Sequence, residues 1–333
     1  MRFRLFCCAL NKVQAAFKRI IPIFPITKKS NMNALTIQNA HKTYANGFTA
    51  LKDVSFNVEQ GEFFALLGQN GAGKTTLISA ISGLNQLTSG KIEVMGFDVK
   101  TQSHQSRMNL GLVPQELVFD PFFNVRQILQ IQSGYFGIRK NDDWIDEMLH
   151  HLGLTDKADT NLRNLSGGMK RRVMVAQAMV HRPPVIILDE PTAGVDVELR
   201  HSLWVFMQSM NKQGHTIILT THYLEEAEQY CQRIAMLKQG ELIALDKTEN
   251  LLHSEQGVRV QIQIPCRLPE NLQPLCIQMI EPNQYVLKLN DYNQIAEISG
   301  SLKTANIHIE NMKILENDLE HVFLNLTKME EKS

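Results

Sequence analysis

The chain has 333 residues, of which 44% are hydrophobic and 20% are charged, a composition typical of globular proteins and not of disordered ones. Its 34 basic and 34 acidic residues give a formal net charge of zero, so the overall charge does not support general nucleic-acid binding. Its five cysteines show neither paired nor metal-ligand spacing, which argues against a disulfide framework and against a zinc site.

No stretch of the sequence approaches the ~20 consecutive apolar residues that span a bilayer, so we expect no membrane-spanning segment here. The first 30 residues carry basic side chains and no acidic one. This segment is either an interfacial amphipathic anchor or an extension upstream of a start at Met32. The second interpretation is favoured, because prolines interrupt the segment and no cleavage site fits a targeting class.

Apolar periodicity predicts the elements of the main domain. Alternation at Leu35–Ile37 and Val54–Val58 predicts two half-buried antiparallel strands, and the continuous apolar run Phe63–Leu67 predicts a strand buried on both faces. Helical spacing from about residue 124 to 181 predicts a helical insertion. Further strands are expected at 185–188 and 216–219, helices at 199–210 and 224–230, and a hairpin turn at Gln239-Gly240. This order predicts a largely parallel α/β core with an antiparallel flank.

The pattern changes after about residue 252, where short alternating stretches are separated by prolines. We therefore expect three regions. Residues 1–31 form an N-terminal extension outside the fold, residues 32–252 form the main domain, and residues 253–333 form a small β-rich domain. A helix from Asn317 to Leu326 is expected to close this last domain.

The buried strand leads directly into the glycine-rich segment GQNGAGKTT, which a helical pattern follows. Strand, glycine-rich loop and helix are together the context of a phosphate-binding P-loop. Its glycines let backbone N–H groups face the phosphates, Lys74 would reach the β and γ phosphates, and the Thr75 hydroxyl would bind Mg²⁺. The candidate ATP site comprises Gly68, Gln69, Asn70, Gly71, Ala72, Gly73, Lys74, Thr75 and Thr76.

Two carboxylates end the buried run Val185–Glu190 (VIILDE), where α/β sheets bind their ligands. Asp189 would hold Mg²⁺ directly or through water, and Glu190 would polarise the attacking water. A solvated acidic turn is the alternative, and the preceding phosphate loop argues against it.

The segment Leu165–Arg172 (LSGGMKRR) predicts a second anion site. Ser166 can cap the following helix, while Gly167 and Gly168 let a phosphate approach the first N–H groups. An ordinary capped helix is the alternative. Basic residues at a helix start oppose the helix dipole, however, and so indicate an anionic partner.

With these motifs in this order, the sequence resembles the ATP-binding subunits of ABC transporters from about Leu35 to Thr248. The resemblance implies a P-loop NTPase core of ABC type that hydrolyses ATP with Mg²⁺.

The resemblance also implies residue roles. Tyr44 would stack on adenine, Gln115 would contact Mg²⁺ and respond to the membrane partner, and Ser166, Gly167 and Gly168 would form the signature loop. Asp189 and Thr75 would hold Mg²⁺, Glu190 would be the general base, Asp196 would communicate between sites, and His222 would hold the γ-phosphate. Taken singly, Tyr44 could pack in the fold and His222 could cap a helix.

In that family two subunits pack head to tail, and the signature loop of one closes on the γ-phosphate held by the other. The resemblance therefore implies a homodimer bound peripherally to a separate permease at the cytoplasmic face of the inner membrane, with no nucleic-acid partner. A finer resemblance, to motors of ABC-2 type exporters, rests on the segments FDPFF at 119–123, GGMKRR, AGVDVELR and LEHVFLNLT.

Two alternatives to an export motor are a soluble ABC ATPase acting on nucleic acid or the ribosome and the motor of an importer. The first usually has two ATP domains, a coiled coil or a zinc hook, and this sequence predicts none of them. The apolar set Val118, Phe119, Phe122 and Phe123 follows Gln115 and predicts an exposed docking surface for the permease. The alternative is that these side chains pack the helical insertion onto the sheet.

Overall fold

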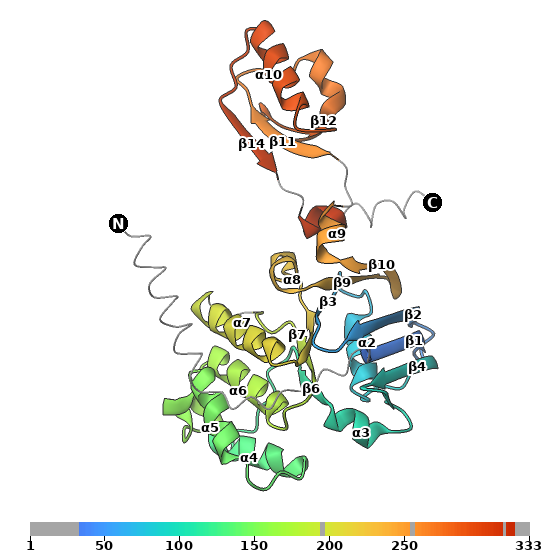
Figure 1. Ribbon diagram of the computed structural model, residues 1–333, viewed down its shortest axis with the longest axis vertical. Coiled ribbons are helices and arrows are strands. Elements are labelled where there is room, and N and C mark those ends of the chain that lie inside the picture. The colour runs from blue at the N-terminus through green and yellow to red at the C-terminus, as the bar shows by residue number, and fades with distance from the viewer. Residues whose placement is uncertain (1–32, 194–196, 254–256, 316–317, 324–333) are drawn as a thin grey trace.

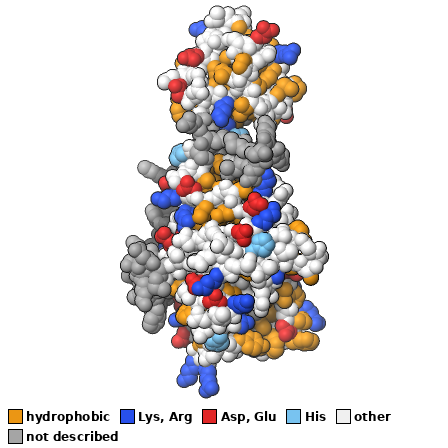
Figure 2. Space-filling model, turned by 90° about the vertical axis from the view of Figure 1, so that its right-hand side faces the viewer, with side chains coloured by type: hydrophobic (Ala, Val, Ile, Leu, Met, Phe, Trp, Pro, Cys, Tyr) orange, Lys and Arg blue, Asp and Glu red, His pale blue; other side chains and the backbone are white. Residues whose placement is uncertain are grey.

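The computed structural model describes residues 33–193, 197–253, 257–315 and 318–323 (Figure 1). The predicted N-terminal extension and Asp196 lie outside the described residues. Within the described ranges, no helix is both long enough and apolar enough to cross a bilayer. Figure 2 shows acidic and basic side chains interspersed over one face of the molecule.

A six-stranded sheet with the order β10-β9-β3-β8-β7-β6 forms the centre of the main domain. Its members are β3 (Phe63–Gly68), β6 (Leu110–Val113), β7 (Val185–Asp189), β8 (Thr216–Thr220), β9 (Arg233–Lys238) and β10 (Glu241–Lys247). All neighbours are parallel except β9 and β10, which form a hairpin. Gln239 and Gly240 turn this hairpin with φ of 48° and 86°, the positive values that tight hairpin turns need. Strands β7 and β8 are buried throughout, which explains their uninterrupted apolar sequences.

A second, antiparallel sheet flanks the first, with the order β2-β1-β4-β5. Its strands are β1 (Asn33–Thr43), β2 (Thr49–Glu59), β4 (Ser89–Val94) and β5 (Phe97–Asp98). Helix α2 (Lys74–Ile81) buries Leu77, Ile78 and Ile81 in one hydrophobic cluster with residues of both sheets. The start of α2 is thereby fixed at the end of β3.

Helices cover the other side of the central sheet (Figure 1). The stretch with helical periodicity contains α4 (Val125–Tyr135), α5 (Asp142–His151), two short 3₁₀ turns and α6 (Gly167–Met179). The remaining helices of this domain are α3 (Ser103–Met108), α7 (Val197–Lys212), α8 (Leu224–Tyr230) and α9 (Thr248–His253). Buried residues of α4, α5, α6 and α7 share one hydrophobic cluster with the central sheet, so the helices hold the loops at its edge in place.

A four-stranded antiparallel sheet, ordered β12-β13-β11-β14, follows the main domain. It consists of β11 (Val258–Gln263), β12 (Cys276–Glu281), β13 (Gln284–Leu289) and β14 (Asn311–Leu315), with a 3₁₀ helix at Glu270–Leu275 and α10 (Gln294–Thr304). Val260, Ile262 and Leu287 of the sheet form a separate hydrophobic cluster with Ile298 and Leu302 of α10. This small unit therefore has its own core.

The last described helical turn does not close that small unit, so our prediction for it is wrong. Leu319, Val322 and Phe323 are buried in the hydrophobic cluster of the main domain. Figure 1 shows this turn, in dark red, beside α9. The spacing i, i+3, i+4 predicts an apolar helical face, but local spacing does not specify which domain covers that face.

Candidate functional site

The phosphate loop is shaped by glycines for which no other residue fits. At Gly68 a Cβ would lie 2.6 Å from the carbonyl oxygen of Leu237, and at Gly73 it would lie 2.6 Å from that of Ala50. Gly71 and Gly73 have φ of 83° and 105°, in the left-handed region. The backbone between β3 and α2 is therefore free to wrap tightly around an anion.

Lys74, the first residue of α2, is only 8% exposed. Its Nζ donates hydrogen bonds to the carbonyl oxygens of Gly68 (2.6 Å) and Gln69 (3.2 Å), so the ammonium lies against the loop. Burial lowers the pKa of Lys74, and the carboxylates of Glu190 and Asp189 oppose this effect. The neighbouring Thr75 is exposed.

Asp189 ends β7, where it pairs in register with Thr220 of β8. It is 8% exposed, and its Oδ1 accepts a hydrogen bond from the Thr220 hydroxyl. Burial raises the pKa of Asp189, while the bond from Thr220 acts in the opposite direction. This carboxylate is thus fixed at the sheet edge, as a ligand for a cation must be.

Three parallel strands bring Gln115, Glu190 and His222 together at their carboxyl ends. Gln115 Nε2 donates a 2.9 Å hydrogen bond to Glu190 Oε2, and His222 Nδ1 lies 3.3 Å from the same oxygen. The Glu190 side chain is 12% exposed, whereas that of His222 is 50% exposed. Glu190 has φ of 48°, unusual for a residue other than glycine, and such backbone strain is concentrated at functional sites. The arrangement presents a carboxylate that can accept a proton from water, with two polar groups to orient it.

Arg171 of α6 binds the backbone of the loops that carry Gln115 and Glu190, a contact that sequence reasoning missed. The guanidinium is 5% exposed and donates to five backbone carbonyls, those of Pro114, Gln115, Asp189, Glu190 and Pro191. Burial lowers the pKa of Arg171, and the carboxylates of Asp189 and Glu190 oppose that shift. Arg171 therefore joins the loop that carries Gln115 to the loop that carries Glu190.

The three basic side chains of α6 all have partners within the chain, so their charges do not themselves require an anionic partner, and the anion site at Ser166, Gly167 and Gly168 stays a prediction. Arg171 binds carbonyls, Arg172 Nη1 donates to the Leu152 carbonyl at 2.7 Å, and Lys170 Nζ lies 4.2 Å from the centre of the Phe119 ring. Ser166 caps α6 by accepting a 3.3 Å hydrogen bond from the Met169 amide. Ser166 and Gly167 are exposed, and a Cβ on Gly167 would meet nothing within 4 Å.

Tyr44 lies at the rim of the phosphate loop. Its hydroxyl is 3.2 Å from Thr76 Oγ1 and accepts a hydrogen bond from Asn85 Nδ2 at 3.1 Å. The residue is 37% exposed, and Lys42 Nζ lies 5.2 Å from the centre of its ring. The ring is therefore fixed next to the loop and not buried in the core.

Comparison with known proteins gives the family. The sequence pattern of the family described as ABC transporter matches residues 51–193. The linearmycin resistance ATP-binding protein LnrL of Bacillus subtilis (strain 168) is 31% identical over 305 residues, which cover 88% of this chain and 98% of that protein. The chain belongs to the ABC transporter family. It is an ATP-binding subunit of that family and hydrolyses ATP.

Other relatives agree with this assignment. The Nod factor export ATP-binding protein I of Burkholderia thailandensis is 39% identical over 246 residues, covering 72% of this ABC subunit and 80% of the relative. A solved ATP-binding subunit of an ABC transporter is 28% identical with a TM-score of 0.63, covering 66% of this chain and 92% of that one. The ATP-binding cassette MJ0796, solved as a post-hydrolysis dimer bound to ADP and Pi, is 26% identical with a TM-score of 0.58. The match covers 64% of this chain and 98% of that cassette. The α/β ABC fold expected from the sequence is confirmed.

The structure brings some of the predicted site residues of this ABC subunit together and leaves others apart. Lys74 of the phosphate loop, Asp189 and Glu190 lie at one edge of the sheet with Gln115 and His222. The signature residues Ser166, Gly167 and Gly168 begin α6, and no hydrogen bond joins them to the phosphate loop in the described part of the chain. Besides Arg171, sequence reasoning missed the buried Thr192, Thr221 and Glu226, in which the two threonine hydroxyls donate to the Glu226 carboxylate. Burial of an acidic residue within a short acidic helix leaves no signal in the local sequence.

Proposed function

We propose that this chain is the ATP-hydrolysing motor of an ABC exporter and that it drives a separate permease of the ABC-2 type. The observation that carries the proposal is the position of Glu190. Its carboxylate is flanked by Gln115 and His222 at the edge of the sheet that also holds Lys74. A carboxylate held in this way can act as general base for a water that attacks the γ-phosphate.

The residues present fit ATP with Mg²⁺. Asp189 and Thr75, together with the amide oxygen of Gln115, offer the oxygen donors that Mg²⁺ prefers, and Asp189 is already oriented by Thr220. Mg²⁺, when bound, would offset the negative charge of the phosphates. Tyr44 would stack on the adenine, and Gly68–Thr76 would surround the phosphates.

In the proposed reaction Glu190 accepts the proton of the attacking water. Lys74 stabilises the charge that develops on the phosphate oxygens, and His222 contacts the γ-phosphate from the opposite loop. The amide of Gln115 orients the Glu190 carboxylate through its 2.9 Å hydrogen bond. Glu190, Lys74 and His222 thus act on the water and the phosphate, which must be held in line for attack.

We further propose that the site is completed in a head-to-tail homodimer. Ser166 and Gly167 are exposed at the start of α6, and open space surrounds the α-carbon of Gly167. In the dimer these residues of one subunit would face the γ-phosphate held by the other, with Asp196 communicating between the two sites. The cassette MJ0796 is itself a dimer.

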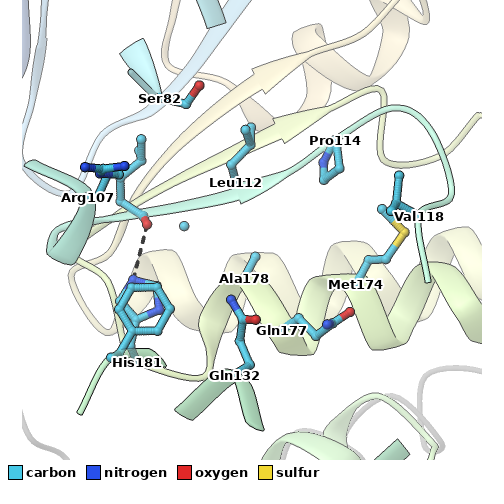
Figure 3. A pocket seen from close by; sticks show the side chains of 13 residues that line it. Ser82, Arg107, Leu112, Pro114, Val118, Gln132, Met174, Gln177, Ala178 and His181 are labelled. Atoms are coloured by element: carbon cyan, nitrogen blue, oxygen red, sulfur yellow. Dashed lines mark hydrogen bonds between the residues drawn. The ribbon is translucent and has the colours of Figure 1, made fainter. Parts of the chain in front are cut away.

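A pocket next to Gln115 supports a docking site for the permease. It has a volume of about 320 Å³ and is lined by Pro114 and Val118 of the Gln115 loop, Gln132 of α4 and Met174 and Gln177 of α6 (Figure 3). A short helix of the permease would fill such a groove and would register movements of Gln115. This interaction would place the subunit at the cytoplasmic face of the inner membrane as a peripheral protein.

Three of the four residues in the predicted apolar docking set are exposed, and the fourth is packed. Phe122 is 79% exposed, Val118 is 68% exposed and Phe119 is 37% exposed, but Phe123 packs against the core of the helical region. Consecutive aromatic residues point in different directions, so Phe123 is partly buried while Phe122 is free to contact a partner. The exposed residues Val118, Phe119 and Phe122 are therefore the proposed docking surface.

Export is favoured over import and over action on nucleic acid, because the relatives include proteins named for linearmycin resistance and for Nod factor export.

The catalytic part of the proposal is tested with Glu190→Gln in the purified full chain. The amide keeps the shape but cannot take the proton, so kcat should fall about 10²-fold or more while ATP still binds. Hydrolysis at a rate near that of the wild type would show that the base lies elsewhere.

A further inference from the structure

Glu226 is a buried carboxylate in the first turn of α8, and it contacts the loops that follow Glu190 and precede His222. It is only 6% exposed. The hydroxyl of Thr192 donates to both of its oxygens, at 2.7 and 3.0 Å, and the hydroxyl of Thr221 donates to Oε2 at 3.0 Å. A buried carboxylate must be satisfied by such donors, so its partners are fixed with it.

Both threonines belong to loops that carry catalytic residues. Thr192 is 0% exposed and lies two residues after Glu190, and Thr221 is 1% exposed and directly precedes His222. The Thr221 hydroxyl also accepts a 3.0 Å hydrogen bond from the amide of Tyr223. One hydroxyl thus holds the backbone on both sides of His222.

These contacts close a ring. From Glu190 the chain leads to Thr192, whose hydroxyl binds Glu226. Glu226 binds Thr221, which precedes His222, and His222 Nδ1 returns to Glu190 Oε2 at 3.3 Å. A shift of either loop would therefore change the distance between the base and the histidine.

Arg200 of α7 completes the surroundings of the ring. Its Nε lies 3.8 Å from Glu226 Oε1, and its guanidinium carbon lies 4.7 Å from the centre of the Tyr223 ring. The positive charge offsets the buried carboxylate, and the stacking holds the residue that follows His222.

We propose that Glu226 is a positioning residue for ATP hydrolysis. It sets the geometry of Glu190 relative to His222 through the hydroxyls of Thr192 and Thr221. The inference rests on the proposed roles of Glu190 and His222 and adds the group that aligns them. Misplacement of a reacting group by about 1 Å can cost about 10²-fold in rate, so loss of the ring acts on kcat more than on ATP binding.

The test compares Thr192→Val and Thr221→Val with Thr248→Val in the purified full chain with Mg²⁺ and ATP. Thr248 is also buried, and its hydroxyl donates to the Cys231 carbonyl, outside the ring. Each ring variant is expected to lower kcat about tenfold, with the KM for ATP within about twofold of wild type. Thr248→Val is expected to keep the wild-type kcat.

A double-mutant cycle then separates positioning from general destabilisation. Because the two hydroxyls act through one carboxylate, adding Thr221→Val to Glu226→Gln should lower kcat no further than Glu226→Gln alone. Glu225→Gln, on the exposed side of the same helix turn, is the matched control and should be fully active.

The proposal is overturned if folded ring variants keep a kcat within twofold of wild type, or if Thr248→Val lowers kcat as much as they do. It is also overturned if the losses in the double variant simply multiply. If Glu190→Gln itself remains active, the proposed function fails independently of this inference.

Discussion

The backbone amide of Leu319 donates a 3.4 Å hydrogen bond to Glu228 Oε2 and so joins the last described helical turn to α8. Leu319 is 0% exposed and shares a hydrophobic cluster with Cys231 and Leu251. The small sheet unit from Val258 to Leu315 comes between these segments in the sequence and has a cluster of its own. The ATP-binding domain is therefore assembled from two separate parts of the chain.

Leu319→Ala should destabilise the ATP-binding domain although it lies beyond the small unit in sequence. Removal of a buried leucine typically costs about 2–5 kcal/mol of unfolding free energy. The chain has two tryptophans, Trp144 and Trp204, and both are buried in this domain's cluster. Urea unfolding followed by tryptophan fluorescence therefore reports on this domain and should show an earlier transition.

Leu302→Ala is the matched control, because Leu302 is also 0% exposed but belongs to the cluster of the small unit. It should leave the tryptophan transition where it is in the wild type. An equal shift in both variants would mean that the two units unfold as one, and an unchanged transition in Leu319→Ala would contradict the assignment of this turn.

Lys74→Ala should abolish productive ATP binding. The ammonium is the charged side chain held inside the phosphate loop, and loss of a charge-assisted hydrogen bond costs about 1.5–3 kcal/mol. Binding of a fluorescent ATP analogue should accordingly weaken at least about tenfold. Lys100→Ala removes an exposed lysine outside the loop and should bind normally. Unchanged affinity in Lys74→Ala would mean that the phosphates bind elsewhere.

The segments whose local structure the sequence predicted well are motifs with local geometry. Gly68 and Gly73 have no room for a Cβ, and Lys74 directly follows Gly73 at the start of α2. The carboxylates at 189 and 190 follow a run of buried apolar residues that fixes the end of β7. In such segments a few consecutive residues determine both the backbone and the direction of the side chains.

The interactions that the sequence did not predict join segments far apart in the chain. Arg171 binds carbonyls around residues 115 and 190, and Glu226 binds Thr192. Backbone carbonyls carry no residue-specific signal, so the sequence does not show which of them Arg171 binds. The threonine hydroxyls that donate to Glu226 come from separate loops that only the fold brings to it. The same reason explains the error for Leu319, whose apolar face could pack against either unit.

Phe122→Asp should separate docking from folding. Phe122 is 79% exposed, so a carboxylate there remains in water and the purified subunit should fold and hydrolyse ATP normally. When co-expressed with an ABC-2 type permease it should no longer co-purify with it, because a charged residue would oppose burial in an apolar interface.

Phe123→Asp provides the contrast to that variant. Phe123 packs against the core of the helical region, so this substitution should lower the stability of the subunit itself. Loss of folding in Phe122→Asp, or retention of the permease by that variant, would contradict the proposed docking surface.

His181 should make the stability of this domain depend on pH. Its ring stacks on Phe136 with centroids 3.6 Å apart, and its Nε2 lies 3.2 Å from the Leu110 carbonyl, which can only accept (Figure 3). Nε2 therefore carries the proton, and the buried Nδ1 has no hydrogen-bond partner among the described residues. Burial lowers the pKa of His181 to about 4.

Because this folded-state pKa lies below the ordinary value of about 6.5, the unfolded chain takes up the proton first as the pH falls. The stabilisation is fully present above about pH 6.5 and is lost as the pH falls from there towards about 4. His181 alone should cost about 2 kcal/mol of unfolding free energy between pH 7 and pH 5.

His181→Gln keeps an N–H donor for Leu110 but cannot be protonated, so its urea midpoint should fall less over this interval than that of the wild type. His104→Gln, at an exposed position of α3, should keep the wild-type pH dependence. Equal pH dependence in His181→Gln and the wild type would show that His181 is not the group that takes up the proton.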